Sequence, residues 1–315
     1  MTRELVVGAL DRLASARPEE LVAGVVNLVV TVAAIGELAW LWHHQPQGSR
    51  ARAREAVAAA GMAVGAMLVA IGMTVATAVV WSWWATLAPD QWARWWSGTA
   101  LAFPVAFLAW DAAGYVYHRL GHTTALGWAA HRPHHTGTEY NLTLAWRQSW
   151  FPVLSVAVMP VVAVTGLPRG SVLLVAAVSN LVQALQHTSR EWPLPRWAAD
   201  VVFTPDRHRT HHLRGAGAVN LGPTLTLWDR VGGTWDPARC TGGTFGEAAA
   251  SGSLDVVRMQ LAGWRALLGA GRDHGRGGGR GRQAVRSRCR RRSADGSDTA
   301  PHGSPTSTAS TGSFP

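Results

Sequence analysis

The chain has 315 residues, 48% of them hydrophobic, and a formal net charge of +10. This length is enough for one substantial domain. The charge is uneven, because residues 270–315 carry nine arginines against three aspartates, so the rest of the chain is only mildly basic. Charge therefore does not single out a nucleic-acid-binding fold, and we expect no specific nucleic-acid partner.

Two long apolar segments follow a short N-terminal segment, residues 1–20. Leu21 to Trp42 is apolar apart from Glu37, and Val57 to Ala88 contains no charged residue. A membrane-spanning helix needs about 20 apolar residues, so each segment is long enough to cross a bilayer. The acidic residues before Leu21 favour a retained anchor over a cleaved signal peptide. We therefore expect transmembrane helices within residues 21–97.

Tryptophan and arginine positions predict how these helices lie in a membrane. Tryptophan prefers the membrane–water interface. Eight tryptophans gather near the ends of the first three apolar segments: Trp40, Trp42, Trp81, Trp83, Trp84, Trp92, Trp95 and Trp96. Cytoplasmic loops are enriched in arginine, and the loop expected at residues 45–56 carries Arg50, Arg52 and Arg54. We expect this loop and the histidine-rich segments in the cytoplasm, residues 83–97 outside, and a multi-pass protein of a bacterial-type plasma membrane.

Three further apolar segments come next. Gly98 to Tyr117 contains Asp111 near its end and leads directly into a histidine pair. Trp150 to Leu167 and Ser171 to Leu185 are shorter and are separated by Pro168-Arg169-Gly170. Proline and glycine interrupt regular structure, and both segments are marginal as full spans, so a hairpin or re-entrant pair is expected.

Nine of the thirteen histidines lie between residues 118 and 212. They are His118, His122, His131, His134, His135, His187, His208, His211 and His212. Residues four apart on a helix share a face, so His118 and His122 can point at one ion. His131, His134 and His135 form one triplet, and His208, His211 and His212 form a second. Each triplet can present two rings from one face of a helix and a third ring beside them. Nine imidazoles are too many for one ion, and first-row metals accept imidazole readily, so we expect a dinuclear site with redox-active iron.

Structural zinc fits this pattern less well. Such sites are usually closed by four ligands and are rich in cysteine thiolate, whereas Cys240 and Cys289 belong to no CxxC pair.

Prolines beside the triplets also constrain the local structure, because proline is tolerated only in the first turn of a helix. We expect a helix to start near Arg132, with His131 at its entry, and a second helix to start after Pro205.

These motifs resemble the fatty acid hydroxylase and sterol desaturase superfamily of membrane oxygenases. The residues that carry the resemblance are Asp111-Ala-Ala-Gly-Tyr115-Val-Tyr-His118-Arg-Leu-Gly-His122, His131-Arg-Pro-His-His-Thr136, Glu139-Tyr-Asn141, Gln186-His187-Thr188, Thr204-Pro205-Asp-Arg-His208-Arg-Thr-His-His212 and Leu227-Trp-Asp229-Arg-Val-Gly-Gly-Thr-Trp235. The resemblance includes every dense histidine motif of the chain.

The resemblance implies an all-α fold, an integral membrane helical bundle with a cytosolic helical cap holding a histidine-rich dinuclear metal site. It implies two iron ions with all nine histidines as ligand candidates, and dioxygen as co-substrate. The fatty acid hydroxylase-like catalytic domain would span residues 98–245, followed by a C-terminal helix within residues 246–269. Residues 270–315, rich in Arg, Gly and Ser, are expected to be disordered, with anionic lipid headgroups, nucleic acid or solvent alone as alternative surroundings.

Carboxylates near the motifs are candidates for supporting the metal. A ligating imidazole usually donates its other N–H to a carboxylate or carbonyl, which points to Asp111, Asp206 and Asp229; for Asp229 an ion pair with Arg230 is the alternative. A carboxylate in an apolar segment is costly, which strengthens the case for Asp111. Tyr115 and Glu139 are candidates for proton relay or for structural hydrogen bonds. We take Asp111, Tyr115 and Asp229 as the catalytic candidates.

The predicted function is that of a membrane di-iron oxygenase. It would use dioxygen and electrons from a separate donor, of the ferredoxin or cytochrome type with a reductase, to hydroxylate or desaturate a lipid C–H bond. Fatty acyl, sterol and carotenoid substrates all fit, and hydroxylation is slightly favoured over desaturation or ether cleavage. The alternatives are a zinc-dependent lipid hydrolase and a histidine-rich metal transporter, whose sites should lie within the spans.

Overall fold

The computed structural model describes residues 18–97, 99–240, 242–246 and 254–269. The described residues form helices and connecting loops without a β-strand, and two isolated β-bridges join Val202 to Leu225 and Leu213 to Phe245. The prediction of an all-α fold is confirmed. Residues 1–17 and the tail expected to be disordered, 270–315, lie outside the described residues, and the division into domains stays a prediction.

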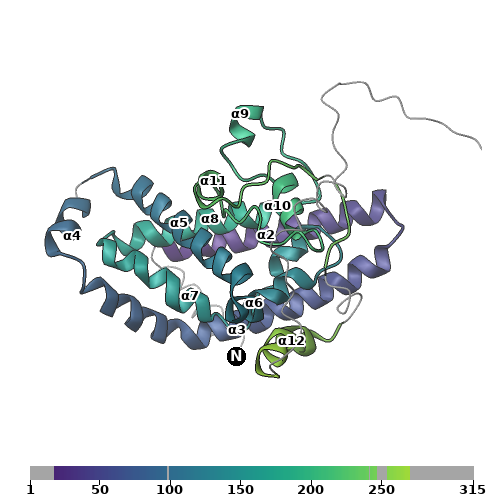
Figure 1. Cartoon of the computed structure of the whole chain (residues 1–315), viewed down its shortest axis with the longest axis horizontal. Helices are drawn as coiled ribbons and strands as arrows, with labels where there is room; N and C mark the ends of the chain where they lie inside the picture. Colours follow the sequence, from purple (N-terminus) through teal and green to yellow (C-terminus); the bar gives the residue numbers. More distant parts are fainter. Residues whose placement is uncertain (1–17, 98, 241, 247–253, 270–315) are drawn as a thin grey trace, which may run out of the picture.

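The first two helices, α2 (Pro18–His44) and α3 (Ser49–Ala85), run along the long axis of the molecule (Figure 1). Both are long and apolar enough to cross a membrane, over Leu21–His44 and Ser49–Met73. Only 17% of each apolar window is buried, so these helices present their apolar side chains outward, as a lipid-facing helix does. The connection is shorter than expected, because α3 begins at Ser49 and the three arginines predicted for a loop lie on its first turns.

Helix α4 (Asp90–Ser97) closes the far end of the molecule (Figure 1). Its Trp92 and Trp95 are 47% and 59% exposed. A short helix with outward tryptophans at the end of apolar helices is typical of a membrane interface. The segment expected as a loop at residues 83–97 is therefore partly helical.

The next layer consists of α5 (Ala102–Thr123), α7 (Val153–Val158), the 3-10 helix η3 (Met159–Thr165) and α8 (Arg169–Leu185). Small and β-branched residues pack these elements together, among them Ala106, Val172 and Val175. The segment of residues 150–185 folds as α7 and η3, then a turn, then α8, while a hairpin or re-entrant pair within a membrane stays a prediction. The first limb of this segment changes from α to 3-10 geometry where a proline enters the ladder, and Gly166 makes the turn with φ 68°.

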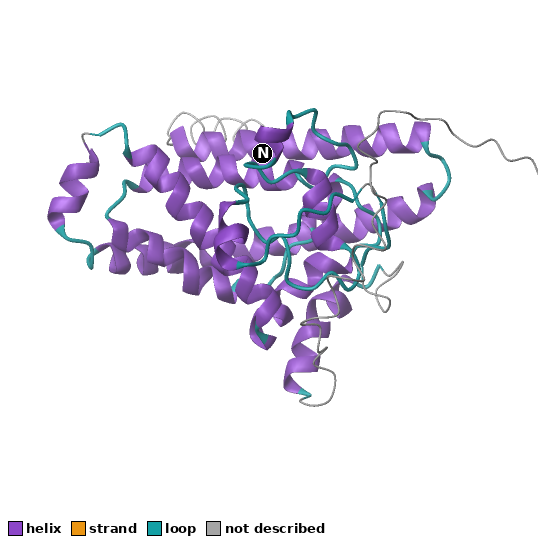
Figure 2. Cartoon of the chain, turned by 45° about the horizontal axis from the view of Figure 1, so that its top comes forward, coloured by secondary structure: helices purple, strands orange, loops and turns teal. Residues whose placement is uncertain are grey.

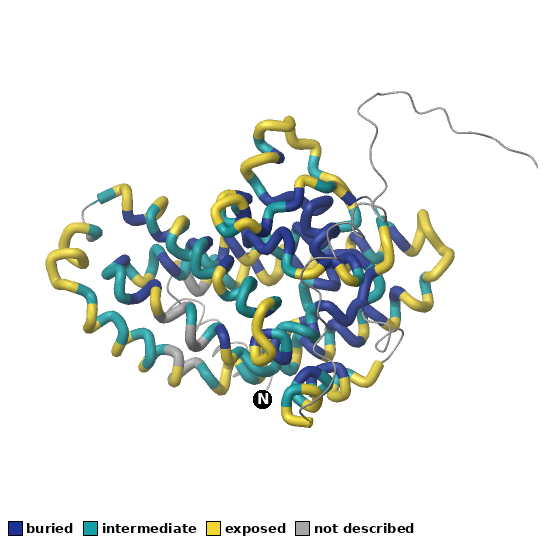
Figure 3. Tube along the Cα trace, viewed as in Figure 1, coloured by how far each residue is buried: buried dark blue, intermediate teal, exposed yellow. Residues whose placement is uncertain are grey.

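The remaining elements form the cap, which lies in the centre and right of centre of Figure 1, away from α4. These are α6 (Ala125–His131), η1 (Arg132–Thr136), η2 (Leu142–Trp146), α9 (Arg196–Ala199), α10 (Pro205–His212), α11 (Leu227–Gly232) and α12 (Val256–Leu268). Loops make up much of this region (Figure 2). All eight residues of α10 are nevertheless buried, within a buried region of the cap (Figure 3), whereas Trp197 of α9 and Leu268 of α12 are exposed. Met259 of α12 packs on Ala58 and Met62 of α3, which joins the cap to the second long helix.

Candidate metal centre

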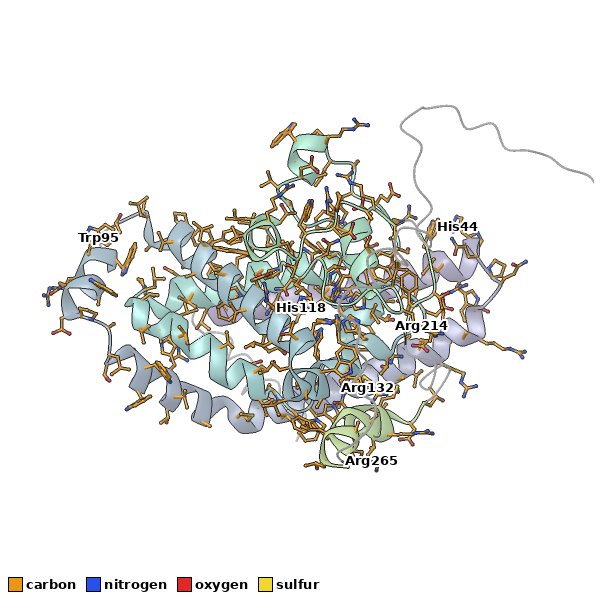
Figure 4. All side chains as sticks on the ribbon, viewed as in Figure 1. His44, Trp95, His118, Arg132, Arg214 and Arg265 are labelled. Carbon is orange, nitrogen blue, oxygen red and sulfur yellow. The ribbon has the colours of Figure 1, made fainter. Side chains whose placement is uncertain are left out.

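The nine predicted ligands converge in the cap and form two groups. His118 lies near the middle of the molecule (Figure 4). In each group one potential ligand atom per residue lies within 4.8 Å of all the others. We call them the five-histidine cluster, formed by His118, His122, His131, His135 and His211, and the four-histidine cluster, formed by His134, His187, His208 and His212. The rings of His135 and His212 stack at 4.4 Å between centroids, so the clusters adjoin.

Helical spacing explains how the histidines are shared between the clusters. Each pair four residues apart enters one cluster: His118 with His122, His131 with His135, and His208 with His212. The middle member of each triplet goes to the other cluster, His134 to the four-histidine cluster and His211 to the five-histidine cluster. Each triplet therefore contributes to both clusters, which is how two short helices can build a site for two ions.

The distances between ring nitrogens match those of ligands around a shared ion. The Nε2 atoms of His118 and His211 are 3.1 Å apart, and those of His187 and His208 are 2.9 Å apart. His131 and His135 bring their Nε2 atoms to 3.2 Å. Neighbouring nitrogens bound at about 2.1 Å from one metal would be about 3.0–3.4 Å apart for octahedral to tetrahedral angles.

Backbone carbonyls orient three of these rings. The Nδ1 atoms of His118, His187 and His211 lie 2.8–2.9 Å from the carbonyl oxygens of Leu221, Gln183 and Val219. A carbonyl oxygen only accepts, so Nδ1 carries the proton and Nε2 offers its lone pair to the cluster. This is the arrangement that supports a metal-ligating imidazole. Carbonyls rather than the predicted carboxylates fill this role for these three rings.

Burial keeps the cap histidines in the form that binds metal. Loss of hydration lowers the pKa of His208, His211 and His212 well below its ordinary range, and the neighbouring imidazoles add to the effect. Burial likewise lowers the pKa of His187 to about 4. These rings are therefore neutral near pH 7, and their lone pairs are available to a cation.

A buried ring nitrogen without a hydrogen-bond partner also fits a metal site. The Nε2 atom of His122 is buried without a hydrogen-bond partner within the five-histidine cluster. A buried polar atom of this kind is costly unless it is paired or coordinates an ion. An all-imidazole donor set of this size suits a first-row transition metal better than a hard cation such as magnesium.

The local helices form largely as the prolines predict. Helix α10 begins at Pro205, and all eight of its residues are buried. A helix also begins at Arg132 with Pro133 in its first turn, but it is the five-residue 3-10 helix η1, and His131 ends the preceding helix α6. Adjacent residues of a helix point in different directions, so His134 and His135 enter different clusters, as His211 and His212 of α10 do.

The predicted carboxylates support the loop that carries the Leu221 carbonyl. Asp229 accepts hydrogen bonds from the backbone N–H groups of Leu221 and Gly222, each at 2.7 Å, and from the Thr234 hydroxyl at 2.6 Å. Asp111 is fully buried and accepts from the backbone N–H of Leu225 at 3.1 Å. The sequence predicts that Asp229 contacts a ligand directly or pairs with Arg230. Asp229 instead holds the backbone of Leu221 and Gly222.

The other predicted polar residues make structural contacts in the cap. Tyr115 contacts the Thr234 hydroxyl at 3.0 Å and accepts from Arg119 at 2.8 Å. Asp206 accepts from the Thr204 hydroxyl, and Glu139 lies 4.0 Å from Arg52. A catalytic part for Asp111, Tyr115 or Asp229 stays a prediction.

Several buried supports were not singled out from the sequence. Gln186, fully buried beside His187, donates to the carbonyl oxygens of Phe203 and Pro223 at 3.0 and 2.7 Å. Arg147 donates to the Thr136 hydroxyl at 2.7 Å and pairs with Glu55 of α3. The sequence signal for these supports is a charged or amide residue beside an apolar segment or a histidine. This signal does not identify the partner of each residue, because the partners are distant in sequence.

Comparison with known proteins agrees with this geometry. Residues 103–234 match the family model described as fatty acid hydroxylase. The chain is 29% identical over 164 residues to alkylglycerol monooxygenase of Xenopus tropicalis, covering 50% of this chain and 31% of that protein. It is 31% identical over 135 residues to the same enzyme of Danio rerio, and 29% over 136 residues to that of Homo sapiens, covering 42% of this chain and 30% of each relative.

The matches thus span about a third of the length of these curated relatives. No solved structure matches the chain. The matched segment contains all nine histidines of the two clusters. The family model and these relatives support the predicted resemblance of residues 103–234 to the fatty acid hydroxylase and sterol desaturase superfamily.

Proposed function

We propose that this protein is a membrane-bound di-iron monooxygenase that hydroxylates a C–H bond of a lipid. The observation that carries the proposal is the pair of adjoining, all-imidazole clusters. A zinc hydrolase site uses fewer ligands and an open position, and a transport site is expected within the spans. The two clusters instead offer one ion five and the other ion four nitrogen ligands.

Iron bound there would supply the activation of dioxygen, with electrons delivered by a separate donor protein or cofactor. The chain's own residues hold the ions and keep bulk water away from them. Burial serves both tasks, since it excludes solvent and leaves the rings neutral; the buried members are His135, His187, His208, His211 and His212. Carbonyls such as Leu221 fix the Nδ1 protons, so each Nε2 atom keeps its direction.

A lipid substrate is supported by the exposed apolar surfaces of the two long helices. Leu28 of α2 and Ile71 of α3 are 63% and 64% exposed, which suits contact with acyl chains. We propose that both helices cross the membrane, that α5 and α8 complete a multi-pass bundle, and that the cap faces the cytoplasm. An apolar substrate would then reach the clusters from the bilayer.

Ether lipids of the alkylglycerol type are the first substrates to test, because the relatives are alkylglycerol monooxygenases. Hydroxylation of the carbon beside the ether oxygen would consume one dioxygen, two electrons and two protons, and release one water. The resulting hemiacetal would split into a fatty aldehyde and free glycerol. Fatty acyl, sterol and carotenoid substrates form the comparison set.

The test is an oxygen-isotope assay with purified, iron-loaded protein in lipid nanodiscs. The protein receives a chemical reductant, ¹⁸O₂ and an alkylglycerol. The proposal predicts that the aldehyde carries ¹⁸O. Rapid reduction to the alcohol traps this label before the aldehyde oxygen exchanges with water. A His134→Ala variant of the four-histidine cluster serves as the inactive control. Product formation that persists without dioxygen, or that requires zinc, would favour the hydrolase.

A further inference from the structure

Glu37 is a buried carboxylate within the first candidate membrane span. Its side chain belongs to α2, and the residue is 8% exposed. An ionisable group in such a segment is expensive and tends to have a specific partner. It lies outside residues 103–234, the part matched by the family model, and none of the roles assigned above uses it.

Four hydrogen bonds to Glu37 come from two loops of the cap. One carboxylate oxygen accepts from the Thr188 hydroxyl, the Ser189 backbone N–H and the Ser189 hydroxyl, each at 2.7 Å. The other oxygen accepts from the backbone N–H of Leu142 at 2.6 Å, at the start of η2. Hydrogen bonds to a charged acceptor are short and strong, which suits these distances.

The turn held by Glu37 directly follows His187. On its other side, Arg209 of α10 donates to the carbonyl oxygens of Thr188 and Ser189 at 3.1 and 3.0 Å. Arg209 is 3% exposed and sits between His208 and His211 in the sequence. The turn is therefore fixed between a carboxylate from the first span and a guanidinium from the histidine helix.

His187 has particular need of such support. The other cluster members have a second ligand on the same helix or in the same triplet, whereas His187 stands alone after α8 ends at Leu185. Its Nε2 atom lies 2.9 Å from that of His208 and 3.2 Å from that of His134. A shift of the turn would carry this ring away from the four-histidine cluster.

We propose that Glu37 is a positioning residue for the four-histidine cluster, so that the first candidate membrane helix forms part of the metal-site scaffold. The inference rests on the proposed metal centre. Loss of a group that orients a metal ligand typically lowers metal affinity 10–100-fold. In Glu37→Gln the metal affinity of the four-histidine cluster should fall by about this factor. The amide NH₂ group would face an N–H group that now donates a hydrogen bond to the carboxylate.

The experiment measures cobalt(II) and iron(II) content and affinity of the full chain in detergent, by chelator competition and elemental analysis. Wild type should hold two ions, and Glu37→Gln should keep one tightly while the other binds 10–100-fold more weakly. Asp90→Asn is the control, since this carboxylate is exposed at the start of α4 and has no part in the proposed metal site. It should behave as wild type.

Combination with ligand variants separates positioning from general damage to the fold. In a His134→Ala background, where the four-histidine cluster is already impaired, Glu37→Gln should leave the remaining ion unchanged. Equal weakening of both ions, or wild-type affinity in Glu37→Gln, would overturn the inference. Should Glu37→Gln fail to fold, Ser189→Ala removes one donor and keeps the carboxylate, and unchanged affinity in that variant would overturn it as well. Wild-type protein with fewer than two ions would instead refute the proposed function.

Discussion

Asp229 offers the sharpest test of how the loop of residues 219–234 positions a ligand. Its carboxylate accepts three hydrogen bonds, two of them from the backbone N–H groups of Leu221 and Gly222. In Asp229→Asn one oxygen becomes an NH₂ group, so one N–H or hydroxyl donor loses its acceptor. Such a loss costs about 1.5–3 kcal/mol for a charged acceptor.

An opposing effect reduces this cost. Burial raises the pKa of Asp229, which means that the charged form is penalised, and the neutral amide avoids that penalty. We therefore expect Asp229→Asn to lower the free energy of unfolding of the apoprotein by about 1 kcal/mol, less than the lost hydrogen bond alone would cost. The Leu221 carbonyl that accepts from His118 should shift with its loop, so the five-histidine cluster should bind metal about 10–100-fold more weakly.

The assay combines chemical unfolding of the metal-free protein with chelator competition. Asp90→Asn, on the exposed end of α4, is the control and should change stability by no more than about 0.5 kcal/mol. Two ions bound with wild-type affinity in Asp229→Asn would refute the idea that this loop positions His118.

Three further predictions concern ligands, pH and the contact between cap and membrane helices. His134→Ala should lose one of two ions while membrane insertion, measured by protease protection, stays as in wild type, because the spans do not depend on metal; retention of both ions would contradict the cluster assignment. The apoprotein should lose stability as pH falls from about 6.5 towards 4, because burial lowers the pKa of His187 to about 4 and that of His208 well below its usual range. The unfolded chain then binds more protons than the folded one, so acid favours unfolding, and flat thermal stability from pH 8 to 5 would argue against buried neutral histidines. Arg147→Met should cost about 3–5 kcal/mol in urea unfolding, because it leaves the carboxylate of Glu55 buried without its partner; a change below about 1 kcal/mol would show that α3 and the cap are held by apolar packing instead.

Much of the scaffold follows from local sequence signals. The long apolar segments predict α2 and α3, and Pro168 with its neighbours predicts the turn before α8. Spacing also predicts that His118 and His122 act together, because a period of four residues is a local property of a helix. Counting imidazoles predicts two ions, and the nine histidines do form two clusters.

The division of the histidines between the clusters is a different matter. Spacing pairs the histidines four residues apart, but which pairs and single rings meet in one cluster depends on how the separate segments pack, and spacing alone does not specify this. The carbonyl of Leu221, the turn held by Glu37 and the Arg147–Glu55 pair join residues far apart in the chain. Such contacts are set by tertiary packing, and a single sequence carries no period or motif that reveals them.

The most direct test of the central claim is metal stoichiometry with Mössbauer spectroscopy on the full chain loaded anaerobically with ⁵⁷Fe. We predict two irons per chain in nitrogen-rich surroundings, magnetically coupled after oxidation because the clusters adjoin. One ion per chain, or two irons without coupling, would contradict the account of a dinuclear centre.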